Sequence, residues 1–244
     1  MIKFFRKIRQ QMLAESKFTQ YLIYAVGEIV LVVVGIMIAL SINNASEVDK
    51  LRQKEITLLT EMQQNLTIDL LDLEYNAKGN ALRIRANEMV LSALKNRTPM
   101  NDSLKFFYAG VFGNFQFSEN TGAWATLQSV GLDLISNDSL RNAISHLYTV
   151  RYEYLENVEK GVDDNYQWNV MYPQILEQVN MDELWVSATP VNHEALMDNR
   201  KFQETLKMNL FLRNVMQSMY ADINNEVTVV RDHIDNHIKT LKES

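Results

Sequence analysis

The chain has 244 residues, 47% of them hydrophobic, with 8 glycines, 3 prolines and no cysteine. So few turn residues disfavour an all-β sandwich or barrel, and the missing cysteine excludes disulfides, thiolate nucleophiles and cysteine-based metal sites. The net charge is −6, yet residues 1–20 carry five Lys or Arg residues and one Glu, so the rest of the chain is acidic and nucleic acid is not an expected partner.

Residues 1–20 have the pattern of a basic amphipathic helix. Apolar side chains recur at helical spacing in "MIKFFRKIRQQMLAE", and basic side chains flank them. Such a helix lies on an anionic membrane surface, although the same charges also serve simply to orient a membrane protein. Both interpretations place the segment in the cytoplasm. The residues predicted to contact membrane lipid are Lys3, Phe5, Arg6, Lys7 and Arg9.

Residues 21–43 are predicted to form a transmembrane helix. From Tyr21 to Ile42 there are 22 residues with one charge, and a helix of that length spans about 33 Å. A cleaved signal peptide is the alternative, but its apolar region is only about 7 to 15 residues long. The excess of Lys and Arg before the segment predicts a cytoplasmic N-terminus and an exported remainder, which is the periplasm if the membrane is a Gram-negative inner membrane.

One ionisable side chain, Glu28, interrupts the apolar segment. At about 100° per residue, Gly35 and Ala39 share its helix face. A carboxyl beside small residues indicates a face that packs on a second copy or on another membrane subunit. A protonated or snorkelling Glu28, or one coupled to proton or ion movement, remains open. The predicted packing face consists of Tyr21, Tyr24, Glu28, Gly35 and Ala39.

Residues 44–244 are predicted to form an extracytoplasmic antiparallel helical bundle with long first and last helices. The first helix follows the anchor directly and ends at "NRTPMNDS", and the last occupies about 40 residues near the C-terminus. The apolar stripe of the first helix is predicted to comprise Val48, Leu51, Leu58, Met62, Leu66, Leu70, Leu73, Leu82, Met89, Val90 and Leu94. The fold class is therefore all-α.

Between the long helices, the sequence predicts further helices with clear ends. A short helix ends at Gly131, and a new one begins with Ser136 or Asn137 as its cap. The new helix runs to about Tyr172, where Pro173 is expected to end or kink it. "MDELWVSATPVNHE" is predicted to be an irregular connection.

Six aromatic residues lie in the short stretch "FFYAGVFGNFQF". Aromatic side chains of this kind usually fill a bundle core, but an exposed group of them would mark a partner site. The possible partner patch consists of Phe106, Phe107, Tyr108, Phe112, Phe115 and Phe117.

Catalytic signatures are weak. His233 and His237 lie four residues apart in "HIDNH", a spacing that can hold a metal, but Ile234 occupies the position where a zinc protease has its catalytic Glu. Solvated histidines on a polar helix face are the favoured interpretation. No phosphate loop, nucleophile elbow or dinucleotide fingerprint appears, so we predict no catalytic residue, metal, cofactor or small-molecule substrate.

Three segments together resemble a known family. "KFFRKIRQQML", "GEIVLVVVGIMIALSINN" and "LQSVGLDLISNDSLRNAI" are similar to an uncharacterised family of Bacteroidota membrane proteins, the domain of unknown function 6090. The resemblance implies an inner-membrane protein with a helical extracytoplasmic domain, and it implies no activity. We expect a non-enzymatic scaffold or accessory subunit of a membrane complex. The alternative is a sensor, or an ion- or proton-coupled subunit that uses Glu28.

Overall fold

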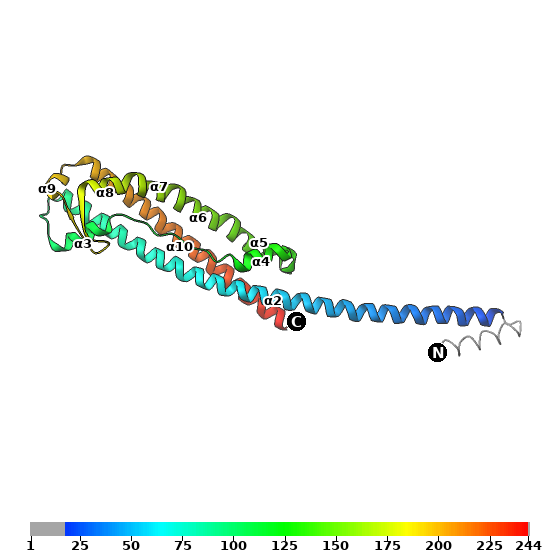
Figure 1. Ribbon diagram of the computed structural model, residues 1–244. Helices are drawn as coiled ribbons and strands as arrows, with labels where there is room; N and C mark the ends of the chain where they lie inside the picture. The colour runs from blue at the N-terminus through cyan, green and yellow to red at the C-terminus, as the bar shows by residue number, and fades with distance from the viewer. Residues whose placement is uncertain (1–17, 244) are drawn as a thin grey trace. The chain divides into compact units, whose positions relative to one another are not determined.

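The computed structural model describes residues 18–243, with side chains described from residue 22 (Figure 1). The chain divides between Lys54 and Glu55 into two compact units, which we call the anchor unit and the bundle unit. Helix α2 (Phe18–Lys95) supplies residues to both. The predicted membrane-surface residues Lys3, Phe5, Arg6, Lys7 and Arg9 lie outside the described residues.

In the anchor unit, residues 18–54 of α2 are helical. This part of α2 is long and apolar enough to cross a membrane, and none of its most apolar window is buried within the described residues. β-Branched residues such as Val32 and Val33 do not prevent the helix, because each retains one preferred rotamer in a helix and lowers helix propensity only slightly. The prediction of one long apolar helix near the N-terminus is therefore confirmed.

The bundle unit contains three long helical stretches that lie side by side in Figure 1. They are the rest of α2, the consecutive segments from α5 to α8, and α10 (Arg200–Glu243). Two hydrogen bonds show that α2 and α10 run antiparallel: Gln63 contacts Asp235, and Asn80 contacts the Arg213 carbonyl. The all-α class with long first and last helices is confirmed.

Short elements complete the bundle unit. They are α3 (Asp102–Gly110), α4 (Gly122–Val130), the 3₁₀ turn η1 (Leu132–Leu134) and α9 (His193–Leu196). The middle stretch consists of α5 (Asp138–His146), η2 (Leu147–Tyr152), α6 (Glu153–Val158), η3 (Glu159–Asp163), α7 (Asp164–Tyr166), η4 (Gln167–Met171) and α8 (Tyr172–Gln178). Here η2, η3 and η4 are π-helical turns. A π turn inserts one residue into the helical hydrogen-bond pattern and often marks a functional site.

Burial on α2 follows the predicted stripe only in part. Leu58, Met62, Leu66, Leu73, Val90 and Leu94 are buried in the core as predicted. Leu82 is exposed, however, and so is Met89. The buried seam continues instead through Asn76, Asn80 and Asn87, which occupy the same helix face at three-, four- and seven-residue steps. In this part of α2, asparagines therefore occupy the core face, and apolar residues such as Leu82 lie outside it.

The helix ends between the long stretches arise from local capping. Gly131 has φ +103°, a conformation that favours glycine, and it ends α4 as predicted. The Asn137 side chain accepts a hydrogen bond of 3.0 Å from the Leu140 N–H and so caps α5. Pro173 was expected to end or kink the helix, and it does not end it. The chain stays helical to Gln178, because Pro173 lies in the first turn of α8, directly after a π turn, where a missing N–H is tolerated.

The predicted irregular connection is wrong in detail. Residues 179–190 form an antiparallel hairpin of β1 (Val179–Glu183) and β2 (Ser187–Pro190), in which Val179 pairs with Pro190. Ala188 and Pro190 are buried on one face while their neighbours are partly exposed, the alternation expected of a strand. Asp182 accepts a hydrogen bond of 2.6 Å from the Thr189 hydroxyl, which stabilises the pairing.

Candidate functional site

Residues 111–121, between α3 and α4, run along the bundle unit without forming a helix or strand, and side-chain carboxylates bind their backbone (Figure 1). Because these residues pair with no strand, their backbone N–H groups need other acceptors. Asp72 accepts from the Ser118 N–H at 2.9 Å, and Asp69 accepts from the Asn120 N–H at 2.9 Å. Acidic residues on α2 therefore bind backbone groups, although the sequence pattern alone placed them on a solvated helix face.

Glu159 in the π turn η3 is the most unusual of these carboxylates. It is buried, and the Phe117 N–H donates to both of its oxygens at 3.1 Å. The Tyr220 hydroxyl lies 2.8 Å from Glu159 and 3.0 Å from the carbonyl oxygen of Phe115. Burial is the main cause that raises the pKa of Glu159 to about 7, with smaller contributions from the charges of Asp163 and Asp72, while the hydrogen bonds from Tyr220 and the Phe117 N–H act in the opposite direction.

One helical turn further, η3 supplies the acidic half of a buried ion pair. Asp163 pairs with Arg213 of α10, and each side chain is 1% exposed. Asn80 of α2 completes the contact, because its side-chain oxygen accepts from Arg213 Nη1 at 3.3 Å while its amide donates to the Arg213 carbonyl at 2.7 Å. All three long stretches of the bundle therefore meet at this pair.

The π turn η4 adds an amide cluster beside the ion pair. Gln167 accepts a hydrogen bond from the Gly113 N–H at 2.9 Å and donates to Asn209 at 2.7 Å. Asn209 in turn donates to Asn87 at 3.2 Å and to the Val111 carbonyl at 2.7 Å. We call the residues Asn80, Asn87, Glu159, Asp163, Gln167, Asn209, Arg213 and Tyr220 the polar core.

The polar core was missed by the sequence reasoning. Its signal was present, because Asn80 and Asn87 lie on the helix face that Leu73 and Val90 share. Asparagine is rarely buried without a hydrogen-bond partner, so its recurrence at core positions predicts an internal network. The partners on the other helices are not readable from spacing within α2.

His237 lies in a second cluster near Glu55, where the bundle unit begins. Glu55 Oε1 contacts His237 Nε2 at 2.9 Å and accepts from the Ser136 N–H at 2.8 Å. The Ser136 hydroxyl is 3.4 Å from the same His237 nitrogen. In a hydrolase triad the serine and the acid contact opposite ring nitrogens, so this arrangement does not activate Ser136. The expectation of a solvated His237 is wrong, because its side chain is only 10% exposed.

No metal site is found among residues 18–243, where no group of three or more His, Asp or Glu side chains is placed to hold an ion. His233 therefore shares no such group with His237. Both lie on α10, and His233 is partly exposed.

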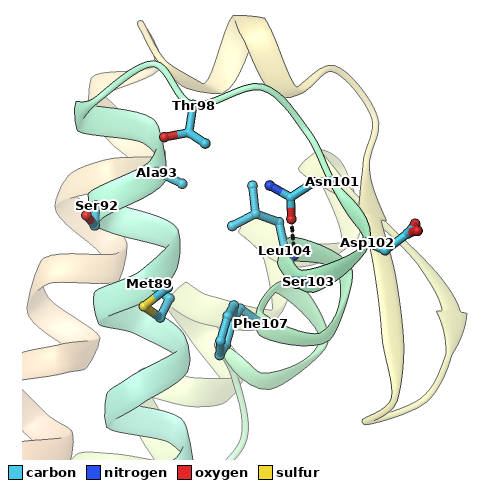
Figure 2. Close-up of a pocket in the computed structure, with 9 residues that line it drawn as sticks. All are labelled: Met89, Ser92, Ala93, Thr98, Asn101, Asp102, Ser103, Leu104 and Phe107. Atoms are coloured by element: carbon cyan, nitrogen blue, oxygen red, sulfur yellow. Dashed lines mark hydrogen bonds between the residues drawn. The ribbon is translucent and has the colours of Figure 1, made fainter.

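A pocket of about 440 Å³ lies between the end of α2 and the start of α3, at the Lys95 end of the bundle unit (Figure 2). Its wall combines apolar and hydroxyl or amide side chains. Asn101 caps α3 there, accepting a hydrogen bond from the Leu104 N–H at 3.1 Å. The lining residues are Met89, Ser92, Ala93, Thr98, Asn101, Asp102, Ser103, Leu104 and Phe107.

The six aromatic residues predicted as a possible partner patch do not form one exposed surface. Tyr108, Phe112 and Phe117 are buried in the hydrophobic core, where core packing was the other interpretation. Phe107 and Phe115 are partly buried, and only Phe106 is exposed, at 54%. Core packing, the usual interpretation, therefore describes three of the six residues: Tyr108 lies on the buried side of α3, and Phe112 and Phe117 follow α3 into the core.

The predicted anchor face lies on α2. Tyr24, Gly35 and Ala39 are exposed, and Glu28 is partly buried beside Ala25. A side chain added at Gly35 would meet no described atom within 4 Å, and the same is true at Gly27. Tyr21 belongs to the same helix.

Comparison with known proteins identifies a family. No curated protein and no solved structure shows significant similarity to the chain. The sequence model of DUF6090, described as a family of unknown function, matches residues 28–171, which is more than half of the chain. The match begins at Glu28 in the anchor unit and ends with η4 of the polar core. The chain therefore belongs to DUF6090.

Proposed function

We propose that this chain is a non-enzymatic, single-pass protein of a Gram-negative inner membrane that acts as a scaffold or accessory subunit of a membrane complex. Its N-terminus would lie in the cytoplasm and its bundle unit in the periplasm. Assembly would use the anchor face and the bundle unit. The partners would be membrane lipid together with a second copy or another membrane subunit.

The observation that carries this proposal is the exposed state of the apolar part of α2. A core helix of a soluble protein would be mostly covered, whereas none of the most apolar window is buried by the described residues. Exposed apolar side chains of this extent need lipid or another helix around them. Gly35 offers a surface without a side chain, which lets a second helix approach closely.

The bundle unit supports a structural rather than a chemical role. Its buried acids contact groups of the same unit, since Glu159 accepts from the Phe117 N–H and Asp163 pairs with Arg213. Such networks rigidify a domain and define one arrangement of its helices. A rigid helical bundle on a membrane helix is suited to presenting a surface to a partner.

Replacing Gly35 by leucine is expected to disrupt assembly, because the side chain would hold the partner helix away. The matched control is Gly27→Leu, since Gly27 is equally open but points about 100° away from Glu28. Purification in a mild detergent followed by native mass spectrometry would measure the complex. We expect Gly35→Leu to lose at least about half of the assembled species while Gly27→Leu retains it. Equal behaviour of both variants would contradict the assigned face.

A proton- or ion-coupled role for Glu28 is the second candidate. It is favoured by the position of Glu28, which is the only ionisable side chain among the apolar residues 25–42. Glu28→Gln separates the two roles when the activity of the co-purifying complex is measured in addition to its assembly. A packing role tolerates the amide, whereas a proton-carrying role leaves assembly intact but removes the activity of the complex that co-purifies.

The proposed topology can be tested directly because the chain has no cysteine. Single cysteines at Ser16 and at the exposed Ser218 would be labelled in intact cells with a membrane-impermeant maleimide. We expect Ser218→Cys to react at least about tenfold faster than Ser16→Cys, because only the periplasmic side is accessible. Permeabilised cells provide the control, in which both react. Preferential labelling of Ser16→Cys in intact cells would reverse the assigned topology.

A further inference from the structure

Arg83 of α2 is a partly buried cation without a carboxylate partner among the described residues. Among residues 18–243, no Asp or Glu oxygen lies within 4.0 Å of its guanidinium. Its only hydrogen bond to the described residues is a long one, 3.5 Å from Nη1 to the Gly110 carbonyl. The Arg83 Nε atom is buried and has no partner among those residues. A guanidinium has five N–H donors, and the described residues offer this one a single distant carbonyl, which leaves the buried Nε–H without an acceptor.

The groups around Arg83 supply no negative charge to compensate its guanidinium. Aromatic rings flank it, with the guanidinium 4.4 Å from the Trp185 ring centre and 5.7 Å from that of Phe115. The second cation nearby, Arg213, already takes the charge of Asp163. Burial, and then the charge of Arg213, lower the pKa of Arg83 to about 10. Arg83 therefore remains charged at neutral pH, and its positive charge is not balanced locally.

Trp185 reaches Arg83 at the expense of a strained backbone. It lies in the turn between β1 and β2 with φ +65°, which is an outlier for a bulky residue. Its ring stacks on Phe112 at 4.7 Å and covers Gly113, where the Trp185 ring leaves no room for a side chain. Strain of this kind persists where surrounding contacts enforce it and is concentrated at ligand-binding sites.

We infer that Arg83 and Trp185 form a binding site for a small carboxylate ligand, whose two oxygens bind the edge of the guanidinium. A carboxylate matches the planar donor geometry of arginine and brings the single negative charge that the site lacks. The Trp185 ring covers one face of the guanidinium and leaves its edge as the place where a carboxylate can bind. This inference concerns the bundle unit and does not depend on the proposed assembly function.

Acetate is the probe for this site, tested on the full-length protein in mild detergent at constant ionic strength. Thermal unfolding would be followed with increasing acetate, and with chloride and phosphate in parallel. We expect saturable stabilisation by acetate in the millimolar range, because a ligand that binds the folded state raises the unfolding temperature. Arg83→Met should weaken acetate binding by about tenfold or more. Arg85→Met, at an exposed arginine two residues further, is the matched control and should respond like the wild type.

Trp185 provides a second readout that does not depend on the stability of Arg83→Met. In a variant with Trp124→Phe and Trp168→Phe, Trp185 is the only tryptophan, and its emission should change saturably with acetate. The inference is overturned if acetate gives neither saturable stabilisation nor an emission change. It is also overturned if Arg83→Met keeps the wild-type response. Equal effects of acetate, chloride and phosphate would show a general salt effect and would likewise reject the site.

Discussion

Asp163→Ala is expected to destabilise the bundle unit by about 3–5 kcal/mol, the largest effect predicted for a single substitution in this chain. The reason is that Arg213 would remain buried with its charge uncompensated. Both side chains of the pair are 1% exposed, so water cannot replace the lost carboxylate without opening the bundle. Chemical unfolding of the full chain in mild detergent, followed by circular dichroism, would measure the change.

Two controls make this prediction specific. Glu226→Ala removes the acid of the pair between Arg151 and Glu226, which has a similar contact of 2.6 Å but about 30% exposed side chains, and should cost at most about 1 kcal/mol. The double variant Asp163→Leu with Arg213→Met removes both charges and should recover much of the stability lost in Asp163→Ala. If Asp163→Ala lowers the free energy of unfolding no more than Glu226→Ala does, the buried pair contributes no more to stability than an exposed pair.

The stability of the chain is expected to fall, relative to Glu159→Gln, as the pH rises from about 4.5 to about 7. Glu159 has an ordinary pKa of 4.5 and one of about 7 when folded, so the folded state binds more protons across this range. Its contribution is complete below about pH 4.5 and is lost as the pH passes about 7. A shift of this size corresponds to at most about 3 kcal/mol.

The contacts of Glu159 explain why the neutral acid suits this site. The single proton of the Tyr220 hydroxyl cannot serve both Glu159 and the Phe115 carbonyl, although both lie within 3.0 Å. A protonated Glu159 can donate to the Tyr220 oxygen, which frees the hydroxyl to donate to Phe115. Ionisation leaves one of these acceptors unsatisfied, in addition to the cost of a buried charge.

Glu159→Gln is the appropriate reference because glutamine resembles the neutral acid and does not titrate. Its amide can donate to Tyr220 while its oxygen accepts from the Phe117 N–H. The pKa of Asp69 is also raised, chiefly by burial, and it adds the same slope to both proteins. Unfolding free energies would be measured from pH 4 to pH 8. Parallel curves for the two proteins would show that Glu159 does not titrate in this interval.

Local features of the chain were readable from the sequence because their causes lie within a few residues. The run of apolar residues in α2 is long enough to predict a membrane-spanning helix by composition alone. Gly131 ends one helix through its positive φ, and Asn137 begins the next through its side chain. The helix of about 40 residues predicted near the C-terminus is α10, whose buried residues, such as Phe202, Leu206 and Ile234, recur at helical spacing.

The hairpin and the helix beyond Pro173 were not predicted because the competing local signals were weak or misleading. A proline normally breaks a helix, but Pro173 lies in the first turn of α8, directly after the π turn in which Gln167 contacts Asn209 of a distant helix. Trp185 adopts a strained turn conformation because distant residues, Phe112 and Arg83, hold its ring. Contacts between positions so far apart in the sequence produce no periodic pattern of residues from which they could be predicted.

By itself, then, the sequence determined the helical class, the apolar helix near the N-terminus and the helix ends at Gly131 and Asn137, since periodicity, length and capping act over one or two turns. Only the tertiary structure decided which polar residues are buried and what they bind. Glu159 and Lys160 look equally suited to solvent in the sequence, yet one is buried and the other exposed. The physical reason is that the free-energy cost of burying a charge depends on its partners. Glu159 meets Tyr220, and Asp163 meets Arg213, only when the helices that carry them pack together.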